Sequence, residues 1–160
     1  MAKTENRGPD LRIHPPFLFL MPLGAGLLVQ HYVPIEIVSS IGAAKILDYV
    51  GVAEIFIGAS LAAWAVATLR RLGTHVVPMH DATVLADAGP YTLTRNPIYL
   101  AFAIIYVGIT FVLNAFWPLL FLPEAIVFTY LFAIKREEEY LSREFGDSYA
   151  AYREIGRAHV

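Results

Sequence analysis

The chain is built around long apolar runs that hold few or no charged side chains. A helix crosses a bilayer with about 20 mostly apolar residues, within a range of about 17 to 25. Runs of this length, placed this close together, would leave a soluble helical bundle almost no polar surface. The sequence therefore predicts an all-α integral membrane protein with about four transmembrane helices, near residues 17–33, 49–69, 98–113 and 116–134.

The composition excludes several other classes of protein. Hydrophobic residues make up 57% of the 160 residues and charged residues 16%, which excludes intrinsic disorder. The 12 Lys and Arg are outnumbered by 14 Asp and Glu, so we expect no nucleic-acid partner. The chain contains no cysteine, which excludes disulfides, thiolate metal sites and a cysteine nucleophile. We expect a single membrane domain over residues 1–160.

The distribution of basic residues predicts the topology. No Ala-x-Ala-like cleavage site follows the first run, so we expect a retained helix rather than a signal peptide. Lys and Arg lie in the N-terminal segment, in the loop 70–97 and in the tail 135–160, whereas the first loop holds only Lys45. Because cytoplasmic segments are enriched in Lys and Arg, both termini and the middle loop are predicted to be cytoplasmic.

The third and fourth runs are separated by little more than Asn114 and Ala115. So short a connection requires an antiparallel helical hairpin, and Pro118 fits the first turn of its second helix. The hairpin brings the loop 70–97 and the tail 135–160 to the same end of the protein. We expect the polar chemistry of the chain to lie there.

The end of the middle loop predicts the start of a helix. Asn96 is a favourable N-cap residue and Pro97 suits the first helical position. The N-terminus of a helix can hold an anion, and Arg95 adds a full positive charge beside it. On local features alone two interpretations stay open: the segment binds an anionic ligand, or it only caps a membrane helix.

The tail continues the fourth run as an amphipathic helix. Leu141 and Phe145 lie one turn apart on one face, and Gly146 can end the helix. Tyr149 and Tyr152 then recur on a second short helix. The consecutive glutamates at the start of the tail are either a solvated helix face paired with basic neighbours, or ligand-binding carboxylates.

Together the two segments form a compound pattern, Gly89-Pro-Tyr-x-x-x-Arg-Asn-Pro-Ile-Tyr99 followed by Glu137-Glu138-x-x-Leu141-x-x-x-Phe145-Gly146-x-x-Tyr149-x-x-Tyr152. Over roughly residues 68–157 the chain resembles the isoprenylcysteine carboxyl methyltransferase and phospholipid methyltransferase family of integral membrane enzymes. The resemblance implies S-adenosylmethionine as cofactor, with S-adenosylhomocysteine as product. It also implies that the C-terminal hairpin and the tail helices form the cofactor pocket.

The resemblance assigns site residues by position. The residues implied in cofactor binding are Tyr91, Arg95, Asn96, Pro97, Tyr99, Leu100, Glu137 and Glu138. The glutamates are expected to hold ribose or amino groups, and Arg95 or Arg153 is the catalytic candidate that holds an anionic group. Asn96 stands where many members have His, so it is given no acid–base role. Arg157 does not align cleanly with the family's C-terminal end.

The expected acceptor is a lipid or a lipidated small molecule that enters from the bilayer. Both O-methylation of a prenylcysteine-type carboxylate and N-methylation of a phospholipid amine stay open, and the short chain resembles prokaryotic members of the cytoplasmic membrane. The alternatives are an NADPH-dependent reductase of the sterol-reductase type and a non-enzymatic membrane subunit.

No metal site is expected, since His75 and His80 lack a third ligand, and no oligomeric state is predicted. Glu54 and Glu124, within the runs, are either functional groups or helix-packing groups.

Overall fold

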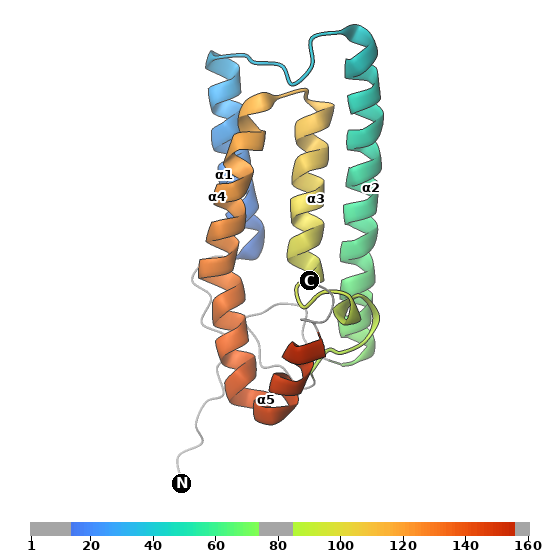
Figure 1. Cartoon of the computed structure of the whole chain (residues 1–160), viewed down its shortest axis with the longest axis vertical. Helices are drawn as coiled ribbons and strands as arrows, with labels where there is room; N and C mark the ends of the chain where they lie inside the picture. The colour runs from blue at the N-terminus through green and yellow to red at the C-terminus, as the bar shows by residue number, and fades with distance from the viewer. Residues whose placement is uncertain (1–13, 74–84, 156–160) are drawn as a thin grey trace.

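The computed structural model describes residues 14–73 and 85–155. Every named secondary-structure element in these ranges is a helix or a helical turn. Four long helices run along one axis of the molecule (Figure 1). The all-α expectation is therefore confirmed for this part of the chain. In order, the elements are α1 (Pro15–Tyr32), α2 (Ile41–Arg71), the 3₁₀ turn η1 (Gly89–Thr92), α3 (Pro97–Val112), α4 (Phe116–Thr129), the π-helical turn η2 (Tyr130–Ile134) and α5 (Lys135–Ile155).

The start of α2 differs from the prediction. The helix begins at Ile41 rather than near residue 49, because the Ser40 hydroxyl accepts a hydrogen bond from the Ala43 backbone N–H at 3.2 Å. A serine in this position satisfies one of the unpaired N–H groups at a helix start. Lys45 and Asp48, which were expected in a loop, are exposed side chains of the helix.

The helices associate chiefly in two pairs, α2 with α3 and α1 with α4. Glycines allow the first pair to approach closely. A Cβ atom added to Gly51 would lie 2.6 Å from the Gly108 carbonyl oxygen, and one added to Gly58 would lie 2.8 Å from the Ala101 carbonyl oxygen. Small residues at these positions bring two backbones into direct contact, as is common between membrane helices.

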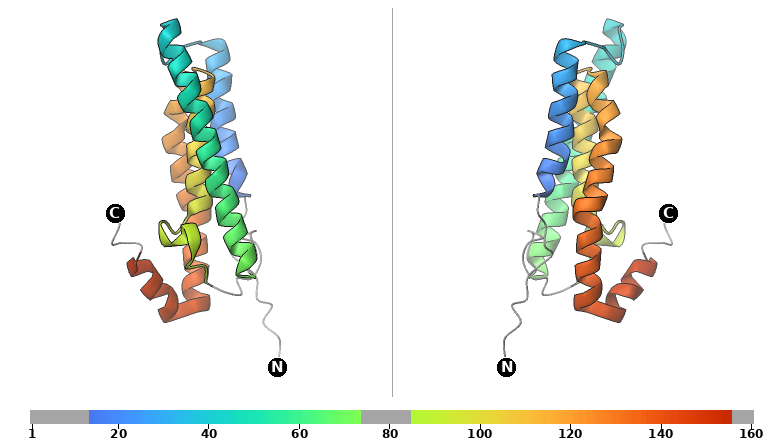
Figure 2. Two further views of the ribbon diagram at one scale, coloured as in Figure 1. Left: turned by 90° about the vertical axis from the view of Figure 1, so that its right-hand side faces the viewer. Right: turned by 90° about the vertical axis from the view of Figure 1, so that its left-hand side faces the viewer.

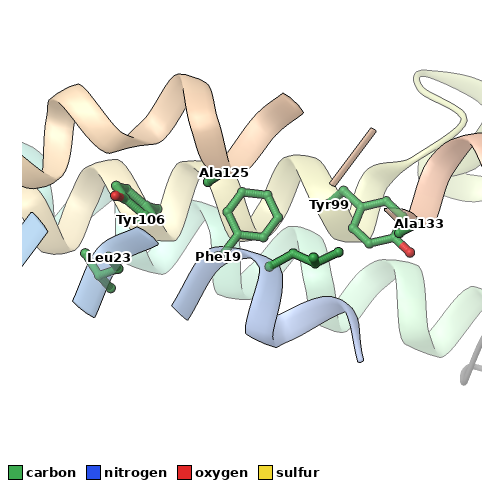
Figure 3. Packing of buried hydrophobic residues seen from close by; sticks show 7 residues of the cluster. Phe19, Leu23, Tyr99, Tyr106, Ala125 and Ala133 are labelled. Carbon is green, nitrogen blue, oxygen red and sulfur yellow. The ribbon is translucent and has the colours of Figure 1, made fainter. Parts of the chain in front are cut away.

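The buried core lies between α1, α3 and the rod formed by α4 and η2 (Figure 3). The rings of Phe19 and Phe102 lie 5.8 Å apart, and the Tyr106 hydroxyl donates to the Pro118 carbonyl oxygen at 2.8 Å. The hydroxyl therefore has the partner that a buried phenol requires. The buried members of this cluster are Leu18, Phe19, Leu23, Tyr99, Tyr106, Ala125 and Ala133.

The predicted hairpin turn between α3 and α4 is confirmed. Asn114 adopts a φ of 46°, a left-handed conformation that asparagine tolerates better than most residues. Its side chain accepts from the Val38 N–H at 3.0 Å and donates to the Val38 carbonyl at 2.8 Å. Trp117 Nε1 donates to the Val33 carbonyl at 2.7 Å. These contacts fasten the hairpin to the α1–α2 connection at one end of the bundle.

The outer faces of the bundle are apolar. Both α2 and the continuous helix Phe116–Arg153 are long and apolar enough to cross a membrane, and only 17% and 22% of their most apolar windows are buried. The core helix of a soluble protein would be mostly buried, whereas Tyr49 is 76% and Phe56 70% exposed. The shorter apolar helix α3 falls below this length. Two candidate spans are therefore established by length and composition, and the count of four stays a prediction.

The fourth helix continues past the apolar region, as predicted. It passes through η2 into α5 and breaks at Gly146, where φ is 50° and ψ −121°. The last part of α5 then turns back towards η1 (Figure 2). The described part of the middle loop and the tail thus lie at one end of the bundle, opposite the turn that joins α3 to α4 (Figure 1). Which side of a membrane this end faces stays a prediction.

Candidate active site

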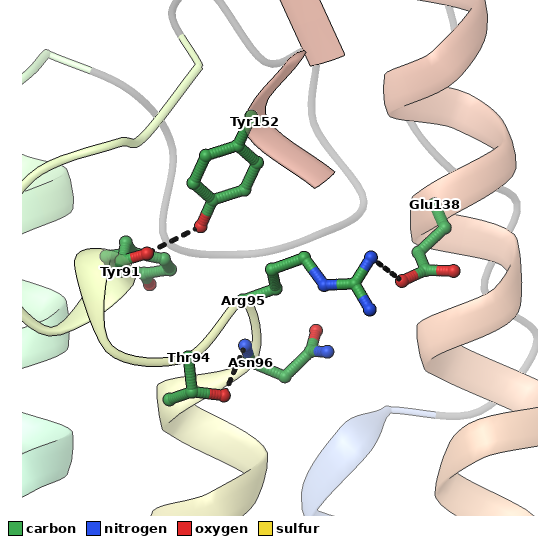
Figure 4. A network of polar contacts seen from close by, with 6 residues as sticks. All are labelled: Tyr91, Thr94, Arg95, Asn96, Glu138 and Tyr152. Carbon is green, nitrogen blue, oxygen red and sulfur yellow. Dashed lines mark hydrogen bonds and ion pairs between the residues drawn. The ribbon is translucent and has the colours of Figure 1, made fainter. Parts of the chain in front are cut away.

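The N-terminus of α3 forms one side of the site. Asn96 is the residue before the helix and Pro97 is buried at the first helical position, as predicted. The expected side-chain cap is wrong, because the Asn96 side chain makes no capping hydrogen bond. Its φ of −130° and ψ of 55° let the backbone N–H donate to the Thr94 hydroxyl at 3.3 Å. The side chain instead points the same way as Arg95, towards α5 (Figure 4).

Arg95 reaches across to α5 and pairs with Glu138. Nη1 of Arg95 lies 3.1 Å from Oε1 of Glu138, with the two side chains 30% and 24% exposed. The contact is an ion pair that lacks the alignment of a hydrogen bond. Nη1 is shielded from solvent yet has no hydrogen-bond acceptor among the described residues. The guanidinium group therefore retains the capacity to donate to a ligand.

Tyr99 and Glu137 make the second contact between α3 and α5. The Tyr99 hydroxyl donates a hydrogen bond to Oε1 of Glu137. Burial raises the pKa of Glu137 to about 7; the hydrogen bond from Tyr99 opposes this shift and the neighbouring Glu138 charge adds to it. Glu137 lies beyond the apolar part of its helix, which ends at Ile134. A carboxyl group in this state can exchange a proton near neutral pH.

The turn η1 and the last part of α5 close the site from a third side. Gly89, with a φ of 59°, packs against α2, where an added Cβ would lie 2.6 Å from the Thr68 hydroxyl. The Tyr152 hydroxyl donates to the Tyr91 carbonyl oxygen at 2.8 Å (Figure 4). Burial raises the pKa of Tyr152 to about 12, and the neighbouring Tyr149 contributes to this rise as the second largest cause. Tyr152 therefore stays neutral and able to donate across the physiological range.

Tyr149 belongs to this cluster although it was not among the predicted site residues. It is 2% exposed, and its ring lies 6.2 Å from that of Tyr152. Burial and then the Glu138 charge raise the pKa of Tyr149, whereas Arg95 and Arg153 lower it. Arg95 and Arg153 thus both act electrostatically on Tyr149. The spacing of Tyr149 and Tyr152 in an otherwise exposed helix was the signal available in the sequence.

Other candidates lie outside this cluster. Leu100 is 45% exposed and makes no polar side-chain contact. Glu124 is exposed on α4, and Oε2 of Glu54 is buried without a hydrogen-bond partner among the described residues. His75 and His80, for which no metal site was expected, and Arg157 lie outside the described residues. Within residues 14–73 and 85–155 no group of three His, Asp or Glu side chains is arranged to hold a metal ion.

The fold and the cluster define an apolar helical membrane protein with a charged, tyrosine-lined site at one end. The family model described as phospholipid methyltransferase matches residues 47–148, well over half of the chain. The chain therefore belongs to the phospholipid methyltransferase family, a family of membrane methyltransferases, as the sequence pattern indicated. The match includes Arg95 and Glu138 but ends before Tyr149. No curated protein and no solved structure matches the chain.

Proposed function

We propose that the protein transfers a methyl group from S-adenosylmethionine to a lipidic or prenylated acceptor at the cytoplasmic face of the membrane. The observation that carries the proposal is the joining of the family's two motifs by side-chain contacts. Arg95 meets Glu138, and Tyr99 meets Glu137, at the end of an apolar bundle. Bound S-adenosylmethionine supplies a methyl group already activated by its positively charged sulfur.

The residues of the cluster fit this cofactor. The carboxylates of Glu137 and Glu138 suit ribose hydroxyls and an ammonium group, which are hydrogen-bond donors. The unsatisfied Nη1 of Arg95 suits a carboxylate. The backbone around Asn96 and Pro97, with the rings of the neighbouring tyrosines, would enclose the rest of the molecule. The acceptor's anionic group is assigned to Arg153, which shares the neighbourhood of Tyr149. The complete predicted set is Tyr91, Arg95, Asn96, Pro97, Tyr99, Leu100, Glu137, Glu138 and Arg153.

The chain's own residues would position the reactants and exclude water. Methyl transfer to an aligned nucleophile gains most from orientation and from a dry site. The rings of Tyr149 and Tyr152 are buried, and the Tyr152 hydroxyl donates to the Tyr91 carbonyl oxygen of η1. A carboxylate acceptor is already ionised and needs no base. An amine acceptor must lose a proton, and Glu137, with its pKa of about 7, is placed to accept it.

The test is calorimetric titration of the detergent-solubilised chain with S-adenosylhomocysteine, with NADPH in parallel. We expect micromolar binding of S-adenosylhomocysteine alone. Glu138→Ala should weaken this binding roughly tenfold or more, the value of a hydrogen bond to a charged group. Glu139→Ala is the matched control, because Glu139 is the adjacent, exposed glutamate and should leave affinity unchanged. Binding of NADPH alone would favour a reductase, and binding of neither ligand would favour a non-enzymatic subunit.

A further inference from the structure

Tyr99 is a predicted site residue whose side chain lies in the buried core. It is 8% exposed and belongs to the same cluster as Phe19 of α1 and Ala133 of η2 (Figure 3). Its hydroxyl donates a hydrogen bond to Oε1 of Glu137. A phenol has a single O–H to donate, so this bond uses the donor that Tyr99 could otherwise offer to a ligand. Tyr99 therefore acts on the site through Glu137.

Glu137 has a second carboxyl oxygen that remains available. Among the described residues, Tyr99 is the hydrogen-bond donor to its side chain, which is half-buried rather than closed off. A carboxylate accepts on both of its oxygens, so the bond at Oε1 leaves Oε2 for a ligand. Because the bond ties the start of α5 to the first turn of α3, it also fixes where Oε2 can lie. A residue of the core thus holds the carboxylate while its other oxygen can still accept.

The surroundings of Glu137 disfavour its ionised form. Burial raises its pKa to about 7, and the charge of Glu138, its neighbour on α5, adds to this rise. Tyr91 of η1 and Tyr149 of the last part of α5 also face it; burial raises the pKa of each phenol, and the charge of Glu137 adds to the rise. The hydrogen bond from Tyr99 is the influence that lowers the pKa of Glu137. Its removal would extend the protonated state of Glu137 to higher pH.

The ionised form is the one that suits the proposed cofactor. Ribose hydroxyls and an ammonium group are donors, and a carboxylate accepts from them in charge-assisted hydrogen bonds. We propose that Tyr99 is a positioning residue, whose hydroxyl holds Glu137 by Oε1 and keeps a carboxylate oxygen, Oε2, for the donor groups of the cofactor. The inference rests on the proposed function, and it gives Tyr99 a role that involves no contact with the cofactor.

The experiment measures how affinity for S-adenosylhomocysteine depends on pH. The detergent-solubilised full chain is titrated by calorimetry between about pH 6 and about pH 9, as the wild type and as Tyr99→Phe. Wild-type affinity should rise with pH through about 7, where Glu137 ionises. In Tyr99→Phe the rise should move up by about one pH unit or more, the value of a hydrogen bond to a charged group.

The ratio of the two affinities gives the expected effect, because any titration of the ligand itself cancels in it. Tyr99→Phe should bind roughly fivefold or more weakly than the wild type at neutral pH, and like the wild type at the upper end of the range. A residue that touched the ligand, or that only supported the fold, would lower affinity by the same factor at every pH.

Tyr106 provides the matched control. It is a second buried tyrosine of α3 in the same cluster, and its hydroxyl donates to the Pro118 carbonyl oxygen at 2.8 Å. Tyr106→Phe removes a hydroxyl from the same helix without affecting Glu137, so its affinity should follow the wild type at every pH. Glu137→Gln cannot ionise and should lose the rise near neutral pH. If Tyr99→Phe does not fold, 3-fluorotyrosine in place of Tyr99, a stronger donor, should move the rise to lower pH.

Infrared spectroscopy tests the same contact without any ligand. The C=O stretch of a protonated carboxyl group, followed against pH and assigned by its loss in Glu137→Gln, reports the ionisation of Glu137. Its midpoint should lie near 7 in the wild type and in Tyr106→Phe, and higher in Tyr99→Phe.

The two measurements separate this inference from the proposed function. An equal loss of affinity at every pH, or an infrared midpoint that Tyr99→Phe does not move, overturns the inference and leaves the methyltransferase proposal standing. A displaced midpoint in a chain that binds no S-adenosylhomocysteine at any pH would support the hold of Tyr99 on Glu137 and contradict the methyltransferase proposal.

Discussion

Tyr99 donates a hydrogen bond to Glu137 across 38 positions of the sequence. The contact joins the first turn of α3 to the start of α5 and so places the two family motifs side by side. It also holds a carboxyl group whose pKa is raised by burial to about 7. The protonation of Glu137 should therefore be visible in the stability of the protein.

The first prediction concerns pH. The pKa of Glu137 is raised from 4.5 to about 7 by burial, so folding favours its protonated form. The stability that this preference contributes is fully present below the unfolded value and is lost as the pH rises through about 7. Glu137→Gln keeps an acceptor for Tyr99 but does not titrate. Thermal unfolding in detergent should show the wild type losing stability relative to this variant between about pH 5 and about pH 8. A constant difference across that range would contradict the assignment.

The second prediction concerns the pair of Arg95 and Glu138. With 30% and 24% of the side chains exposed, a double-mutant cycle with alanine should give a coupling energy below about 1 kcal/mol. The measurement is the free energy of unfolding of both single variants and the double variant. A coupling of several kcal/mol would make the pair a structural element and would weaken its assignment to ligand binding.

The third prediction concerns the break in α5. Gly146 has a φ of 50° and a ψ of −121°, a conformation that side chains with a Cβ atom rarely adopt. Gly146→Ala should cost about 1–3 kcal/mol of stability, although no atom lies near the added Cβ. Gly24→Ala is the control, because Gly24 is helical with open space around it and should gain about 0.5–1 kcal/mol. Equal effects at both positions would show that α5 does not need this turn.

The fourth prediction concerns the contact that holds the end of α5. Tyr152→Phe removes the hydrogen bond to the Tyr91 carbonyl and should cost about 0.5–1.5 kcal/mol. The loss should appear locally, as faster amide hydrogen exchange in residues 147–155. Tyr49→Phe is the control, since Tyr49 is 76% exposed and its variant should exchange like the wild type. Unchanged exchange in Tyr152→Phe would mean that other contacts hold the helix.

Much of the fold could be predicted because the signals are local. Apolar runs with few charges mark the helices, and the short connection at Asn114 allows only a hairpin. The start of α2 was missed because Lys45 and Asp48 are polar, yet an exposed helix face accepts polar residues when Ser40 caps it. The side-chain cap at Asn96 was wrong because the backbone there donates to Thr94 instead.

The polar cluster could be anticipated only through the family pattern, which related two distant segments. Neither segment alone predicts that Tyr99 reaches Glu137 or that Arg95 reaches Glu138. Tyr149 was missed because its burial depends on the direction in which α5 leaves Gly146. The three-residue spacing of Tyr149 and Tyr152 does not predict the direction of the helix after Gly146.

The helix that continues from α4 through η2 into α5, as far as the break at Gly146, carries Glu138 of the candidate site. The 16 residues of α3 span about 24 Å, against a hydrocarbon layer of about 30 Å. A helix shorter than the layer is accommodated by local thinning or tilt. Because Glu138 continues the rod and Arg95 precedes α3, unequal tilting of the two helices changes the separation of these charges. A membrane thickness that tilts the two helices unequally would therefore act directly on the Arg95–Glu138 pair.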